Sequence, residues 1–239
     1  MAEPRIGIAG WTIPAPLAER FPAEGTGLER YAARLHCAEI NSSFHRSHRA
    51  STWQRWAASV PVDFRFSAKL SKAITHNRKL IECEDFLTAA LAEMTQLGDK
   101  LAVILVQLPP SLAFDPVVAL PFVEALRARW GGGLACEPRH PSWVEPDAEA
   151  LLDRHRIARV AADPARVPEL AAPGGWRGLT YYRLHGSPAL YRSSYDEGRL
   201  EGYAEALAAD TAEERWCIFD NTASSAATGD ALKLQGLTG

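Results

Sequence analysis

The stretch LAVILVQ, residues 101–107, is a run of apolar side chains rich in Val and Ile that stops at the polar Gln107. A short apolar run of this kind is typical of a buried β-strand. The pattern of an apolar run ending at a charged or strongly polar side chain recurs along the chain, and the stops are Glu39, Lys69, Gln107, Glu137, Asp163, His185 and Asp220. Because such stops gather where parallel strands end, the pattern predicts a barrel whose rim carries a site.

Eight strands are predicted in this way. They are Arg5–Gly10, Ala38–Ser42, Asp63–Lys69, Leu101–Gln107, Leu134–Glu137, Ile157–Ala162, Leu179–His185 and Arg215–Phe219. Segments with helical spacing lie between them, at 27–35, 52–59, 85–97, 116–130, 147–155 and 197–209. Strict alternation of strand and helix favours parallel strands joined by crossovers, and eight repeats close most naturally into a (β/α)₈ TIM-type barrel.

One repeat departs from this pattern. The segment Pro164–Gly178 is rich in proline and glycine where the helix after the sixth strand should lie. Both residue types oppose helix formation, so we predict an irregular loop there. A doubly wound open sheet is the alternative fold.

Strand parity places several polar side chains on shared faces. Residues two apart on a strand point the same way, which pairs Glu39 with Asn41, Ser67 with Lys69, Glu137 with Arg139 and Arg183 with His185. Removing an ionised group from water costs several kcal/mol unless partners compensate. The charged side chains are therefore expected to pair with one another, to face a ligand, or both.

The composition indicates one domain, residues 1–239, because 239 residues with 47% hydrophobic content suit a single barrel. A formal net charge of −3 gives no global attraction to nucleic acid or to an anionic membrane, so anion binding must be local. The four cysteines form no Cys-x-x-Cys pair, which favours a reduced, cytoplasmic setting. No signal peptide or membrane span is predicted.

A basic connection follows the third predicted strand. It runs from Lys69 through Lys72 and His76 to Arg78 and Lys79. Lysine and arginine at the mouth of a barrel suit a phosphate or a carboxylate, and His76 adds a group that titrates near neutral pH. The alternative is a solvated basic loop without a ligand.

The segment Glu137–Trp143 is the densest polar motif. Glu137 could act as a general acid or base, with Arg139 holding it ionised or binding an anion, and His140 stands beside them. Trp143 could supply an apolar wall for a sugar or base ring. The alternative is an ion pair that only stiffens the loop.

Two further arrangements use the carboxylates. Glu39 and Glu137 could form the pair that glycoside hydrolysis requires. Alternatively, Glu39, Glu137, Asp163, His185 and Asp220 could gather a divalent metal such as Mg²⁺ or Mn²⁺, although no closely spaced ligand motif is present. At the ends of the last two predicted strands, small residues would let backbone N–H groups approach an anion, and Arg183 and His185 on one face favour an anion site there. The alternative is that Gly186 forms only a turn and residues 222–225 only cap the last helix.

At these motifs the chain resembles the YecE-like family, catalogued as domain of unknown function number seventy-two. The resemblance lies in Gly7–Trp11, Glu39–Phe44, Phe64–Lys69 followed by Thr75 and His76, Leu97–Ser111, Glu137 with Arg139–Trp143, Ala162–Pro164, Arg183–Gly186 and Phe219–Asn221. The chain differs from that pattern at His45 and Pro138. The resemblance implies a TIM-type barrel and names no substrate, because the family has no established activity.

Our hypothesis is an enzyme that acts on an anionic substrate, a phosphate or sugar-phosphate ester, at the carboxyl-terminal rim of the barrel. Its expected catalytic residues are Glu39, Glu137, Asp163, His185 and Asp220. Its expected substrate-binding residues are Trp11, Asn41, Lys69, His76, Gln107, Arg139, His140, Trp143, Arg183 and Asn221. The sequence requires no cofactor. The alternatives are a metal-assisted hydrolase or nuclease and a non-catalytic barrel that binds a metabolite or nucleic acid. Protein partners are not predicted.

Overall fold

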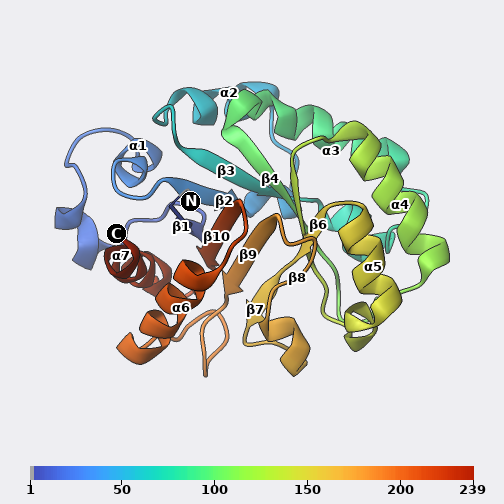
Figure 1. Ribbon diagram of the computed structural model, residues 1–239. Helices are drawn as coiled ribbons and strands as arrows, with labels where there is room; N and C mark the ends of the chain where they lie inside the picture. Colours follow the sequence, from blue (N-terminus) through green and yellow to red (C-terminus); the bar gives the residue numbers. More distant parts are fainter. Residues whose placement is uncertain (1–2) are drawn as a thin grey trace.

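The computed structural model describes residues 3–239, a mixed α/β fold built on one nearly closed, barrel-shaped sheet of ten strands (Figure 1). The strands are β1 (Arg5–Ala9), β2 (Cys37–Ile40), β3 (Arg65–Lys69), β4 (Leu101–Gln107), β5 (Gly133–Glu137), β6 (Ile157–Arg159), β7 (Ala161–Asp163), β8 (Gly174–Gly175), β9 (Leu179–Leu184) and β10 (Glu214–Phe219). Their order in the sheet is β7-β9-β10-β1-β2-β3-β4-β5-β6-β8.

The neighbouring strands pair in parallel, except that β8 pairs antiparallel with β6. Strands β6 and β7 are separated in the chain by Val160 alone, yet β6 pairs with β5 and β7 pairs with β9. The two sides of the sheet therefore meet at Val160, and only the two-residue β8 extends beyond β6. Because this junction nearly closes the sheet, the doubly wound open-sheet alternative is wrong.

The predicted count of eight strands needs correction. The predicted sixth strand, Ile157–Ala162, is split into β6 and β7, because the chain turns at Val160 from one neighbouring strand to the other. The second addition is the two-residue strand β8. It lies within the segment 164–178, which otherwise holds a 3-10 turn, Pro168–Ala171, and no α-helix, as its prolines and glycines predict.

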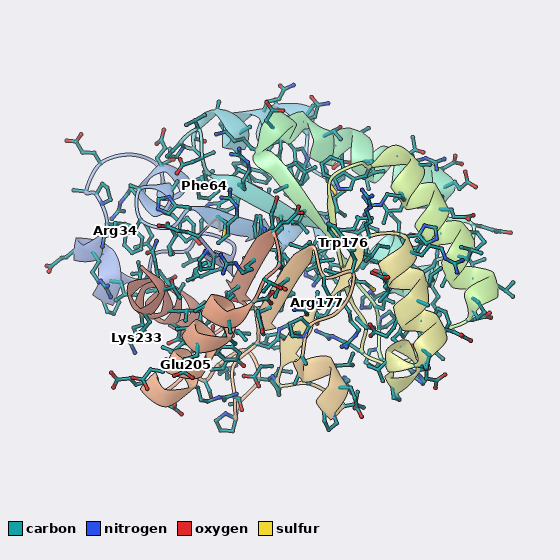
Figure 2. The ribbon with its side chains drawn as sticks, viewed as in Figure 1. Arg34, Phe64, Trp176, Arg177, Glu205 and Lys233 are labelled. Atoms are coloured by element: carbon teal, nitrogen blue, oxygen red, sulfur yellow. The ribbon has the colours of Figure 1, made fainter. Side chains whose placement is uncertain are left out.

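Helices surround the sheet. They are α1 (Gly27–Ala32), α2 (Ala50–Ala58), α3 (Glu84–Met94), α4 (Pro116–Arg129), α5 (Pro146–Arg154), α6 (Glu197–Ala209) and α7 (Ala226–Thr238). Asp115 caps the amino terminus of α4 and Asp196 that of α6, each accepting a backbone N–H of the first turn. Glu205 on α6 and Lys233 on α7 lie in this outer layer (Figure 2). Within residues 3–239 no helix has the length and apolarity needed to cross a bilayer.

Strand parity divides the apolar core into two parts. Alternate strand residues fill the barrel interior, and these are Cys37, Val103, Leu105, Ala135, Ala158, Val160, Leu179, Tyr181, Trp216 and Ile218. The intervening residues, such as Ile8 and Phe66, pack with the helices in a larger cluster. Trp176, beside β6 in Figure 2, packs against the interior cluster. The four cysteines are buried and unbridged.

The interior is crowded at its centre. The rings of Tyr181 and Trp216 stack there at 5.9 Å with an interplanar angle of 11°, a geometry that contributes about 1 kcal/mol beyond area burial. Room for these rings comes from small residues on the other strands. At Gly7 even a Cβ atom would lie 2.2 Å from the carbonyl oxygen of Cys37, so β1 and β2 can approach only with glycine at that position.

Candidate functional site

A layer of polar side chains closes the carboxyl-terminal end of the barrel. Its members point inward from the last positions of the strands or from the residues just beyond, and each is at most 6% exposed. They are Glu39, Lys69, Gln107, Glu137, Arg183, His185 and Asp220. Below them the interior is apolar, so these groups occupy the top of the core. The structure thus brings together seven of the predicted site residues.

Arg183 is the centre of this layer. Its Nε donates to Oε2 of Glu39 at 2.9 Å and its Nη2 donates to Oε1 of the same carboxylate at 2.7 Å. Nη1 donates to Oε2 of Glu137 at 2.6 Å, and Nη2 also reaches Oδ2 of Asp220 at 3.1 Å. One fully buried guanidinium therefore ties carboxylates from β2, β5 and the end of β10, a role that suits the planar, multidentate head of arginine.

Glu137 collects donors from several strands. Oε2 accepts from Gln107 at 2.9 Å as well as from Arg183, while Oε1 accepts from Nε and Nη2 of Arg139 at 3.2 and 3.1 Å. Burial alone would raise the pKa of this carboxyl, but Arg183, His185 and Arg139 outweigh it and hold the pKa well below its usual range. Glu137 is consequently an ionised group and not a proton donor near neutral pH.

His185 lies between two carboxylates. Its Nδ1 is 3.0 Å from Oδ2 of Asp220, and its Nε2 is 3.3 Å from Oε1 of Glu137. Burial opposes the charged ring, but Glu137 and the hydrogen bond to Asp220 together raise the pKa of His185. Because both ring nitrogens face carboxylate oxygens, the geometry fits the doubly protonated imidazolium.

Glu39 connects the layer to the apolar core beneath it. Besides Arg183, its Oε2 accepts the hydroxyl of Tyr181 at 3.1 Å, and the Tyr181 hydroxyl lies 2.7 Å from Oγ of Ser67. Burial, and then the Glu39 charge, raise the pKa of Tyr181 well above its usual value. The phenol therefore keeps its proton and acts as a donor that fixes Glu39 in place.

Lys69 differs from the other charged members of the layer. Its ammonium lies 4.1 Å from the ring centroid of Phe44, and within residues 3–239 it makes no hydrogen bond or ion pair. Burial and then the Arg183 charge lower the pKa of Lys69 to about 8, although Glu39, Glu137 and Asp220 act in the opposite direction. His76 packs edge-on against the same Phe44 ring at 4.9 Å, and burial with the Lys69 and Arg139 charges lowers its pKa.

A cavity of about 210 Å³ opens beside this layer. Glu137 and His185 line its inner wall, and Arg139, Arg166, Leu190 and Tyr191 line its mouth. Tyr191 packs edge-on against His185 at 5.6 Å. Burial opposes the charge of Arg139, but Glu137 and then Tyr191 outweigh it and raise the pKa of Arg139. Arg166 and Tyr191 were not among the predicted site residues. They lie on connections without periodicity, so no strand or helix pattern singles them out.

Asp163 does not join the cluster. On β7 the inward position is Ala162, which lines the cavity, and the Asp163 side chain points to the outer layer, where Arg199 of α6 donates to its Oδ2. The prediction that Asp163 gathers with the other carboxylates is therefore wrong in geometry. Parity explains the error, because Ala158, Val160 and Ala162 are the inward residues of this stretch and Asp163 follows one position later.

Four other predicted residues lie outside the buried layer. Trp11 packs in the helix layer against Trp56 and Phe66. Trp143 is a core residue whose Nε1 donates to the carbonyl of Leu112 at 3.0 Å. The two remaining residues, His140 and Asn221, hold loops: His140 caps a 3-10 turn through Ser142, and Asn221 donates to the Ser193 carbonyl and to Asp230.

Asn41 stands just beyond β2, partly buried, and its Oδ1 has no hydrogen-bond partner within the described residues. That atom is an acceptor near the rim that a ligand or water could satisfy.

The carboxylates are poorly arranged for a metal. In residues 3–239 no group of three or more His, Cys, Asp or Glu side chains has a metal-binding arrangement. The physical reason is that the oxygens of Glu39, Glu137 and Asp220 are already occupied by Arg183 and its neighbours. Arg183 supplies the positive charge that a cation would supply in a carboxylate-rich site.

Comparison with known proteins shows which sequences and structures this chain resembles. The sequence model of a family described as "Protein of unknown function DUF72" matches residues 5–239. The UPF0759 protein YecE of Escherichia coli strain K12 is 30% identical over 152 residues, covering 62% of this chain and 53% of that protein. A YecE protein of Escherichia coli O157:H7 gives the same values. The match thus spans about half the length of these curated relatives.

Two solved structures share the fold. A DUF72 family protein from Enterococcus faecalis V583 has a TM-score of 0.81 at 20% identity, with 98% of this chain and 94% of that chain covered. A DUF72 family protein from Thermotoga maritima MSB8 has a TM-score of 0.77 at 21% identity, with 99% of each chain covered. At these identities the likeness concerns the fold alone.

Proposed function

The chain belongs to the DUF72 family of proteins of unknown function, and we propose that it is an enzyme acting on a small anionic substrate at the carboxyl-terminal rim of the barrel. A phosphate or sugar-phosphate ester is the substrate class that the rim suits best. We further propose that the fold is a single-domain variant of the (β/α)₈ barrel in which one strand is broken at Val160.

The observation that supports this proposal is the charge lining of the 210 Å³ cavity. Arg139, Arg166 and the imidazolium of His185 line it, and Glu137 is the sole acidic residue among its lining groups. Glu137 is itself paired with Arg139 and Arg183. Positive charge therefore remains at the cavity mouth, where a phosphate or carboxylate can accept hydrogen bonds from guanidinium groups.

The side chains of the layer have different parts in this proposal. Arg183 is fully buried and holds the carboxylates in place, so it is a positioning residue. Arg139 and Arg166 bind the anion from the cavity mouth. His185 supplies a proton: its Nε2 contact with Glu137, at 3.3 Å, is longer than its Nδ1 contact with Asp220, at 3.0 Å, so Nε2 is the nitrogen that can turn toward a leaving group.

The ion pairs of Glu39, Glu137 and Asp220 with Arg183 argue against glycoside hydrolysis and against a metal-assisted reaction. Glu39 and Glu137 are both held by one guanidinium, and the low pKa of Glu137 leaves no carboxylic acid for that residue to offer a glycosidic oxygen. The metal-assisted hydrolase or nuclease would require Glu137 and Asp220 to release Arg183. It predicts stoichiometric bound metal that is lost in Glu137→Gln.

A non-catalytic binding barrel is the second candidate. The observation that favours it is that Glu39, Glu137, Asp220 and His185 are all engaged with one another or with Arg183. In that case the protein binds an anion without converting it. A nucleic-acid partner would show itself by affinity that falls steeply as salt is raised, whereas one small anion would give a shallow dependence.

Calorimetric titration tests the proposed function. Inorganic phosphate and a panel of sugar phosphates are titrated into the wild type, Arg139→Gln and the control Arg154→Gln, which removes an exposed charge on α5. We expect binding to the wild type and the control, and at least tenfold weaker binding to Arg139→Gln. Phosphorus NMR of the bound esters then separates turnover from binding. Absence of binding, or binding that ignores Arg139, would overturn the proposal.

A further inference from the structure

The Lys69 ammonium is the one charged head group of the buried layer without a partner in residues 3–239. Glu39, Glu137, Arg183, His185 and Asp220 all exchange hydrogen bonds, whereas no carboxylate oxygen lies within 4.0 Å of Nζ of Lys69. The residue is 5% exposed. An ammonium in this position has lost most of its hydration without gaining an ion pair.

The neighbouring ring compensates only part of that loss. A cation over an aromatic face gains less free energy than the burial of an ammonium costs. Glu39, Glu137 and Asp220 lower the cost from a distance, but Arg183 raises it, and His76 adds no negative charge. The net effect of these contributions is that the neutral form of the Lys69 amine is more favoured in the protein than it is in water.

The neutral amine is a nucleophile. A pKa that falls from 10.5 to about 8 increases the neutral fraction of Lys69 near pH 7 about 300-fold. Desolvated lysines beside another cation are the ones that proteins use for attack on carbonyl carbons. Lys69 meets both conditions, because it is buried and Arg183 is its largest unfavourable charge.

We propose that Lys69 forms a Schiff base with a substrate that carries an aldehyde or ketone in the same molecule as its anionic group. This inference rests on the proposed function and narrows its substrate class to carbonyl-bearing anions, such as an open-chain sugar phosphate or a keto acid. The anionic group lies at Arg139 and Arg166, and the carbonyl carbon reaches Nζ of Lys69.

The step balances without a co-reactant. Nζ of neutral Lys69 forms a bond to the carbonyl carbon, and the carbonyl oxygen takes up a proton to give a carbinolamine. Loss of the hydroxyl group as water then leaves the C=N bond of the imine. Both hydrogens of the water derive in net terms from the amine, and His185 relays one of them by giving its Nε2 proton to the departing hydroxyl.

The groups proposed to contact the two ends of such a substrate lie at the same end of the barrel. Lys69 ends β3 and shares the inward face of that strand with Ser67, whose Oγ lies 2.7 Å from the Tyr181 hydroxyl in the barrel interior. The Lys69 side chain therefore joins the same polar layer as Glu137, which lines the cavity that Arg139 and Arg166 border. A short molecule with an anionic end and a carbonyl end could therefore contact the arginines and the amine at once.

Borohydride trapping tests the inference. The wild-type protein is incubated with DL-glyceraldehyde 3-phosphate, reduced with sodium borohydride and mapped by peptide mass spectrometry. Parallel samples receive DL-glyceraldehyde, which has the carbonyl without the phosphate. The same protein is titrated calorimetrically with inorganic phosphate, so that anion binding is measured apart from imine formation.

We expect the adduct on Lys69 to exceed that on Lys72, Lys79, Lys100 or Lys233 at least tenfold, and to fall at least tenfold with the phosphate-free aldehyde. Lys69→Arg should lose the adduct and keep phosphate binding, while the control Lys72→Arg, on the exposed connection, should keep both. Adducts spread evenly over the lysines, or equal labelling by both aldehydes, would overturn the inference.

The two proposals fail in different ways. Phosphate binding that depends on Arg139, with no adduct on Lys69, refutes the Schiff base and leaves the proposed function standing. Loss of both phosphate binding and the adduct refutes both. The wild-type peptide map decides the inference even where a variant fails to fold.

Discussion

Replacing Lys69 with methionine should make the protein more stable, because a buried, unpartnered ammonium opposes folding. A pKa lowered from 10.5 to about 8 corresponds to roughly 3 kcal/mol, at about 1.36 kcal/mol for each pKa unit. Methionine has similar length and no charge. For a chain of this size, Lys69→Met should therefore raise the melting temperature by roughly 6–12 °C at pH 7.

The sign of the pH dependence gives an independent check. The folded pKa of Lys69 lies below its unfolded value, so between about pH 8 and 10.5 the unfolded state binds more protons and wild-type stability rises with pH. Other titrating groups are common to both proteins. The difference between Lys69→Met and the wild type should consequently be full below pH 8 and vanish by about pH 10.5.

Urea unfolding followed by circular dichroism, at a series of pH values, measures this difference. Lys72→Met is the matched control, because Lys72 is exposed on the same connection and its replacement should change stability by at most about 0.5 kcal/mol. A destabilised Lys69→Met, or a difference that stays constant from pH 6 to pH 11, would show that the ammonium is compensated in the fold and that the reasoning is wrong.

Three further outcomes are expected. Arg183→Met should lower the free energy of unfolding by roughly 3–5 kcal/mol in urea titrations, since Glu39, Glu137 and Asp220 would remain buried without their shared cation. The urea midpoint of the wild type should fall as the pH is lowered below about pH 4. The reason is that the folded pKa values of Glu137 and Asp220 are lowered, so the stabilisation from their ionised forms is lost as the pH falls through those values. A urea midpoint that stays constant below pH 4 would contradict this. Asp163→Asn should leave phosphate affinity by calorimetry within twofold of the wild type, because Asp163 contacts Arg199 outside the barrel, and a tenfold loss would place it in the site after all.

Strand parity predicted the buried layer well because the barrel interior obeys it. Glu39, Glu137 and His185 end apolar runs, and Arg183 shares the face of His185 two residues earlier. On a parallel strand the end of the run and the inward face together fix where a side chain goes. Asp163 fails the same test. Its run ends one residue past the inward position, a distinction that becomes visible only when the register of β7 against β9 is known.

Residues on irregular connections could not be predicted in this way. Tyr191 has a positive φ of 63° and Arg166 lies in the proline-rich segment after β7, so neither belongs to a periodic pattern. Trp143 shows the opposite error. Its position beside a polar motif suggested a ligand wall, but its indole N–H is satisfied by the Leu112 carbonyl and its ring completes the core beside Phe114.

The ion-paired charges of this barrel and the charges left without an ion pair lead to different conclusions about function. The carboxylates of Glu39, Glu137 and Asp220 surround Arg183, and a buried network of this kind can exist for the fold alone. Arg183 and the His185 imidazolium supply two positive charges against these three carboxylates, and Lys69 supplies the third from a distance. The arginines of the cavity mouth exceed what the layer needs. A fold under selection for stability alone would lose a desolvated ammonium readily, since a single substitution to an apolar residue removes the cost. The positive charge of Arg139 and Arg166 therefore points to a molecule that supplies an anion, and the desolvated amine of Lys69 is the position where its arrival should be measured first.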